Sequence, residues 1–165
     1  MTDRRLEGPV RIVGAGLLGA SIGLALQAKG VDVTLADSSP SNLNLAIDYG
    51  AGRAATTGDK PQLIVVCVPP DVTATIVAAE LAAYPEAIVT DVASVKLAPL
   101  AELTALGADV SRPVLIGDRH HDVEGGNANG VPVIFVEWGF SDSHEGDEAA
   151  FRAASVDELR ALLLT

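Results

Sequence analysis

Three glycines near the start of the chain are spaced as in sites where a nucleotide phosphate meets bare backbone. The sequence GAGLLG places glycine at Gly14, Gly16 and Gly19, after a short apolar run and at the start of an apolar helical pattern. Gly14 permits a tight turn, Gly16 lets a pyrophosphate approach the backbone, and Gly19 lets the helix pack close to the strand. The free N–H groups at the helix start favour an anion. The alternative is a tight turn that binds nothing.

An acidic residue follows the glycines at the distance expected for a ribose-binding carboxylate. A second apolar run, Val31–Ala36, ends at Asp37, about 20 residues after the turn. This carboxylate can accept hydrogen bonds from the adenosine ribose, and its charge repels the additional phosphate of NADP. The combined pattern therefore predicts a dinucleotide site for NAD.

Apolar runs of strand length alternate with helical patterns along the chain. Strands are predicted at Arg53–Ala55, Leu63–Val68 and Ala87–Thr90, and helices at Pro40–Tyr49 and Asp71–Ala83. This alternation predicts an α/β fold with a single doubly wound, mainly parallel sheet of the Rossmann type, helices on both faces and strand order 3-2-1-4-5. Ligands of such sheets bind at the carboxyl ends of the strands.

Composition limits the classes of partner and the compartment. The chain has 165 residues, is 48% hydrophobic and contains 16 glycines, which fits one compact domain with a buried sheet. Its net charge of −11 argues against nucleic acid and acidic membranes as partners. A single cysteine, Cys67, excludes a disulfide framework and fits a small buried side chain in a reducing cytoplasm. We expect a soluble, cytoplasmic protein, since no apolar stretch has the length of a membrane span.

Three segments of the first part, VGAGLLGASIGLAL, VCVPPDVT and VTDVASVK, resemble the nucleotide-binding domain of prephenate dehydrogenases, which use NAD. The resemblance extends from Val10 to Ser111. It implies that Val68 and Pro69 border the nicotinamide and that Ser94 faces the substrate end; without it, Ser94 is an ordinary helix cap. The implied cofactor-binding residues are Gly14, Gly16, Leu17, Leu18, Gly19, Asp37, Val68, Pro69 and Ser94.

The same family next has a strand with a histidine motif of the form S-H-P-M-A-G, and then a helical domain that holds substrate and forms the dimer. At that place this chain reads PVLIGDRHHDVEG, and about 40 residues follow. The resemblance therefore implies an open nicotinamide half, weak NAD binding and a monomer.

The second part, VLIGDRHHDVEGGNANGVPVIFVEWGF, resembles the last third of haloacid dehalogenase-type (HAD-like) phosphatases of the phosphoglycolate phosphatase kind. Their G-D-x-x-x-D motif falls on Asp118 and Asp122, whose carboxylates could share a magnesium ion. The aspartate nucleophile of a D-x-D-x-T strand is absent from the sequence, so we expect no phosphatase activity. Asp118 and Asp122 can equally be two solvated acids, with Asp122 favoured by a helix dipole. His120 and His121 are expected to diverge as ordinary surface histidines.

Two partial resemblances that meet near residues 107–113 predict an engineered or recombined chimera. Its fragments would be residues 9–110 (Rossmann) and 111–165 (HAD-like), joined as one compact domain over 1–165 in which later strands extend the first sheet. We expect residual NAD binding without established catalysis. The alternatives are a minimal NAD-dependent oxidoreductase of the prephenate dehydrogenase kind and a Mg²⁺-dependent phosphatase.

Overall fold

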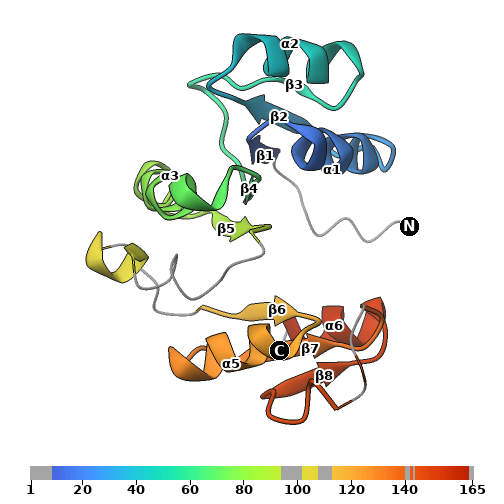
Figure 1. The fold of residues 1–165 in the computed structure, drawn as a ribbon. Helices are drawn as coiled ribbons and strands as arrows, with labels where there is room; N and C mark the ends of the chain where they lie inside the picture. The colour runs from blue at the N-terminus through green and yellow to red at the C-terminus, as the bar shows by residue number, and fades with distance from the viewer. Residues whose placement is uncertain (1–8, 94–101, 108–112, 140–141, 143, 164–165) are drawn as a thin grey trace. The chain divides into compact units, whose positions relative to one another are not determined.

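The computed structural model describes residues 9–93, 102–107, 113–139, 142 and 144–163. The chain divides into two compact units. The N-terminal unit comprises Met1–Ser94 with Ala105–Ala108, and the C-terminal unit comprises Val95–Thr104 with Asp109–Thr165. Each unit has its own parallel sheet (Figure 1). Each also has its own cluster of buried apolar side chains.

The N-terminal unit has a five-stranded sheet in which every pairing is parallel. Its elements are, in chain order, β1 (Val10–Val13), α1 (Leu17–Gln27), β2 (Val33–Ala36), α2 (Pro40–Asp48), β3 (Arg53–Ala54), β4 (Leu63–Val66), α3 (Pro70–Ala83) and β5 (Ile88–Asp91). The strand order is β3-β2-β1-β4-β5. The predicted α/β class and the order 3-2-1-4-5 are therefore confirmed.

The register of this sheet brings the ends of the strands to one level. Val13 at the end of β1 lies opposite Ala36 of β2 and Val66 of β4. The turns that follow these strands start at the same edge, so Gly14 and Asp37 are neighbours although 22 residues of chain separate Ala15 from the aspartate. Both residues therefore lie at the carboxyl edge of the sheet, where ligands of such folds bind.

A charged residue inside β1 shows how both faces of this sheet are filled. Val10 and Ile12 are fully buried in the apolar cluster, whereas Arg11 between them points to the opposite face. Its Nε and Nη2 donate to the two carboxylate oxygens of Glu80 on α3 at 2.9 and 3.0 Å, and its guanidinium lies over the Tyr84 ring. Burial opposes the charge, but the hydrogen bond and the charge of Glu80 hold the pKa of Arg11 above its ordinary value.

The C-terminal unit has a three-stranded parallel sheet in the order β6-β7-β8. Its elements are β6 (Leu115–Gly117), α5 (His120–Ala128), β7 (Val133–Val136), β8 (Phe151–Ala153) and α6 (Val156–Leu163). Apolar residues of β6, α5 and β7 form a cluster around Phe135, which is 1% exposed. None of the helices in the described ranges combines the length and the apolar composition that a membrane span requires.

The predicted extension of the first sheet by the later strands is not found. Among the described strands, β6 pairs with β7 and not with the five-stranded sheet. The physical reason is that the second part closes its own core: all four residues of β7 are buried, and Val133 and Phe135 pack in the apolar cluster of the C-terminal unit. An apolar run such as VIFV fits any buried parallel strand, so its sequence does not determine which sheet it joins.

Candidate nucleotide-binding site

Two of the three glycines are required by the backbone itself. Gly14 has φ +97°, and a Cβ there would overlap the carbonyl group of Cys67 at the end of β4. A Cβ on Gly19 would overlap the carbonyl oxygen of Gly14, because α1 packs directly against the turn. These contacts match the roles that the sequence pattern predicts for both residues: a tight turn and close packing of helix and strand.

Gly16 is different, because it faces open space. It is the N-cap of α1 with φ −71°, and a Cβ at this position would have no atom within 4 Å. The cap has no side-chain hydrogen bond, and the next two side chains, Leu17 and Leu18, are 86% and 59% exposed. The first N–H groups of α1 therefore have neither an intrahelical acceptor nor a capping side chain, which is the arrangement that receives a phosphate.

Asp37 connects the end of β2 to the glycine turn. Its Oδ2 accepts the Ala15 N–H at 2.6 Å, and its Oδ1 accepts the Ser39 N–H at 2.7 Å. The carboxylate also borders a hollow of about 340 Å³ whose wall includes Leu43 and Thr56. Sequence reasoning predicted this aspartate as a ribose acceptor and missed its structural role as a clamp on the turn.

The end of β4 forms the other side of the turn. Val68 lies 3.1 Å from the position that a Cβ on Gly14 would take, and Pro69 follows as the N-cap of α3. Burial raises the pKa of the neighbouring Cys67 thiol to about 11, and the Asp91 charge adds to this effect, so the thiol is neutral at physiological pH. Ser94, the ninth predicted contact, lies outside the described residues.

The two aspartates of the predicted magnesium site are occupied by contacts of their own. Asp122 Oδ2 accepts the N–H groups of Asp118 and Arg119 at 3.2 and 3.1 Å, which caps the start of α5. The Asp118 side chain packs so close to Gly139 that a Cβ there would overlap it. Magnesium binding at Asp118 and Asp122 stays a prediction.

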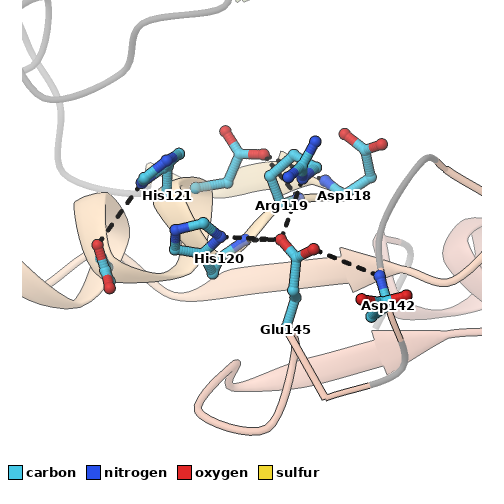
Figure 2. A network of polar contacts seen from close by, with 8 residues as sticks. Asp118, Arg119, His120, His121, Asp142 and Glu145 are labelled. Atoms are coloured by element: carbon cyan, nitrogen blue, oxygen red, sulfur yellow. Dashed lines mark hydrogen bonds and ion pairs between the residues drawn. The ribbon is translucent and has the colours of Figure 1, made fainter.

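A glutamate from a distant loop binds the same helix start (Figure 2). Glu145 Oε2 accepts the His120 N–H and lies 2.9 Å from His120 Nδ1, and it accepts Arg119 Nε–H at 3.0 Å. Its Oε1 accepts the Asp142 N–H at 3.3 Å. The hydrogen bonds from His120 and Arg119 lower the pKa of Glu145 to about 2. No sequence signal links Glu145 to a helix start that lies 25 residues earlier.

The low pKa of Glu145 predicts a pH-dependent contribution to stability. A carboxylate whose pKa falls from 4.5 to about 2 on folding contributes fully above pH 4.5 and loses its contribution as the pH falls toward 2. We expect thermal unfolding of Glu145→Gln and of the unmodified chain to differ at neutral pH and to converge over that window. Glu148→Gln, at an exposed position of the same loop, is the control. A gap that stays constant with pH would contradict the prediction.

A five-stranded parallel sheet in the order 3-2-1-4-5, with an open glycine turn at its carboxyl edge, defines a Rossmann-like α/β unit. A family model described as "prephenate dehydrogenase, nucleotide-binding domain" matches residues 22–135. The chain belongs to this family. The match starts within α1 and continues to β7, so it runs through the predicted junction at residues 107–113 and gives no support to a chimera.

Individual proteins are similar to this chain over part of their length. The probable prephenate dehydrogenase NovF of Streptomyces niveus is 42% identical over 103 residues, which is 62% of this chain and 28% of that protein. The arogenate dehydrogenase of Synechocystis has a crystal structure that matches 59% of this chain and 37% of its own, with a TM-score of 0.53 and 27% identity. The tyrosine-protein kinase PtkA of Mycobacterium tuberculosis is 39% identical over 56 residues, 32% of this chain and 19% of the kinase. The chain thus spans less than a third of the NovF sequence.

Proposed function

We propose that the N-terminal unit binds NAD, with the pyrophosphate at the start of α1 and the adenosine ribose at Asp37. The observation that carries this proposal is the contrast within the glycine turn. Gly16 is open at the N-terminus of α1, while the turn is held in shape by the hydrogen bond from the Ala15 N–H to Asp37. The unpaired N–H groups and the positive end of the helix dipole favour the two negatively charged phosphates.

Asp37 retains the capacity to bind a ribose in addition to clamping the turn. Each of its oxygens accepts one backbone N–H group, and each carboxylate oxygen has two lone pairs. The remaining lone pairs can accept the two ribose hydroxyls, and the adjoining hollow gives the adenosine a surface on which to lie. The negative charge disfavours a 2′-phosphate, so NAD is preferred over NADP.

The family points to the class of reaction that this cofactor would serve. Membership in a prephenate dehydrogenase nucleotide-binding family, together with the NovF relative, supports hydride transfer to NAD as that class. In this proposal Leu17 and Leu18 border the pyrophosphate, and Val68 and Pro69 border the nicotinamide. The N-terminal unit would bind the cofactor, and we favour this function over that of a scaffold that binds no ligand.

A recombined origin is a separate proposal about the C-terminal unit. Its support is that this unit has its own sheet and core, and that the matches to NovF and PtkA, 103 and 56 residues long, are together no longer than the 165 residues of the chain. The family match through residue 135 opposes it.

Calorimetric titration with NAD⁺ and NADP⁺ tests the proposed cofactor. We expect saturable NAD⁺ binding, weaker NADP⁺ binding, and a loss of NAD⁺ affinity of about 10- to 100-fold in Asp37→Ala, as for the loss of hydrogen bonds to a charged group. Asp37→Asn, which keeps an acceptor oxygen and removes the charge, should reduce the preference for NAD⁺ over NADP⁺. This second readout separates recognition of the ribose from damage to the turn.

Asp48→Ala provides a matched control, because it removes an exposed acid at the end of α2 in the same unit. Its affinity for NAD⁺ should equal that of the unmodified chain. Absence of saturable binding at millimolar NAD⁺, or equal binding by the Asp37 variants, would refute the proposal.

A further inference from the structure

All three histidines of the chain lie in the C-terminal unit, and two of them begin α5. Sequence reasoning expected the side chains of His120 and His121 to diverge, and this expectation is wrong: their ring centroids are 3.7 Å apart, with 45° between the planes. Glu124 follows one helical turn later, and its Oε2 lies 3.8 Å from His121 Nδ1. One ligand atom from each of the three residues lies within 4.8 Å of the others.

The hydrogen bond from His120 to Glu145 determines which nitrogen can bind a ligand. An ionised carboxylate can only accept hydrogen bonds, so the His120 Nδ1, which lies 2.9 Å from Glu145 Oε2, is the ring nitrogen that donates. A neutral imidazole then presents the lone pair of its Nε2. Metal-binding histidines are commonly oriented by a carboxylate on the other ring nitrogen in this way. Glu145 is itself fixed by Arg119 and by the backbone of Asp142 (Figure 2).

We propose that His120, His121 and Glu124 bind one divalent transition-metal ion of the zinc class, with water completing the coordination. Two imidazoles and a carboxylate suit zinc, whereas magnesium prefers oxygen ligands alone. Ligand atoms about 2.1 Å from a tetrahedral ion lie about 3.4 Å apart. The three ligand atoms here lie within 4.8 Å of one another, so small rotations of the side chains would bring them to that separation. The adjoining hollow of about 330 Å³ is lined with further acids, including Asp147 and Glu148, whose charge attracts a cation.

Calorimetric titration of the untagged, chelator-treated full chain with ZnCl₂ tests this site. We expect one Zn²⁺ per chain, no displacement by excess Mg²⁺, and loss of saturable binding in His121→Ala. Because the His121 side chain is 76% exposed, this substitution leaves the fold intact, which circular dichroism checks. Glu145→Gln should weaken Zn²⁺ binding about 10- to 100-fold although Glu145 is not a ligand, because it orients His120.

His144→Ala is the matched control, since it removes an imidazole that is 91% exposed and pairs with Asp147 instead. Zn²⁺ affinity should be unchanged in this variant. The proposal is overturned if the unmodified chain shows no saturable Zn²⁺ binding, or if His121→Ala binds Zn²⁺ with the affinity of the unmodified chain. It is also overturned if His144→Ala loses as much Zn²⁺ affinity as His121→Ala. The test is independent of NAD binding, which belongs to the other unit.

Discussion

Replacing Phe135 with alanine should unfold the C-terminal unit while the N-terminal unit stays folded. Phe135 is 1% exposed on β7 and is the largest fully buried side chain among the described residues. Truncating a buried phenylalanine costs about 3–5 kcal/mol, from lost transfer free energy and from the cavity left behind. A domain below about 70 residues rarely has more than about 3–5 kcal/mol of stability from its core, so the loss is comparable to the whole.

Two probes can follow the units separately. The only tryptophan of the chain, Trp138, lies two residues after β7 of the C-terminal unit and is 46% exposed, so its emission reports on that unit. Amide hydrogen exchange of β1 and β4 reports on the other unit. We expect Phe135→Ala to shift the tryptophan emission and to accelerate exchange in β7, while exchange in β1 remains slow.

Phe151→Ala is the control for this experiment, because Phe151 on β8 is 51% exposed. Its loss should cost about 1 kcal/mol or less, and the C-terminal unit should stay folded. If Phe135→Ala instead unfolds both units in one transition, the chain behaves as the single cooperative domain that its length and composition predict, and the division into two units has no thermodynamic counterpart.

The features that the sequence predicted well are local ones. The strand, glycine turn, helix and second strand that end at Asp37 lie within one short segment, where backbone requirements and apolar spacing act between near neighbours. The order of five strands follows from the few connections that short crossovers allow. Arg11 carries a further signal in the sequence: a charge between two buried residues of a strand requires a partner on the opposite face, and Glu80 supplies it.

The features that sequence reasoning missed depend on contacts between distant segments. Glu145 reaches His120 across 25 residues, and no spacing rule relates a loop acid to a helix start. The angle between the His120 and His121 rings depends on rotamers that this glutamate helps to fix. Long-range contacts also decide which sheet Val133–Val136 joins, because this apolar run would fit as a buried strand in either sheet.

Replacing Gly16 with alanine should weaken the binding of NAD⁺ and leave the stability of the fold nearly unchanged. A Cβ at Gly16 contacts no protein atom within 4 Å, and the φ of −71° suits any residue. The cost to the free energy of unfolding should stay below about 1 kcal/mol, mainly from a poorer N-cap. The new methyl group would occupy the space through which a pyrophosphate reaches the N–H groups of α1. We expect NAD⁺ affinity to fall by at least about tenfold, or 1.4 kcal/mol.

Gly14→Ala is the contrasting variant, because it damages the fold itself. Its positive φ costs an L-residue about 1–2 kcal/mol, and overlap with the Cys67 carbonyl adds about 1–3 kcal/mol. Thermal unfolding and NAD⁺ titration of both variants therefore separate the two roles within one turn: Gly16→Ala loses binding alone, and Gly14→Ala loses stability as well. If Gly16→Ala bound NAD⁺ like the unmodified chain, the pyrophosphate could not lie against this backbone. The start of α1 would then be a tight packing turn and nothing more.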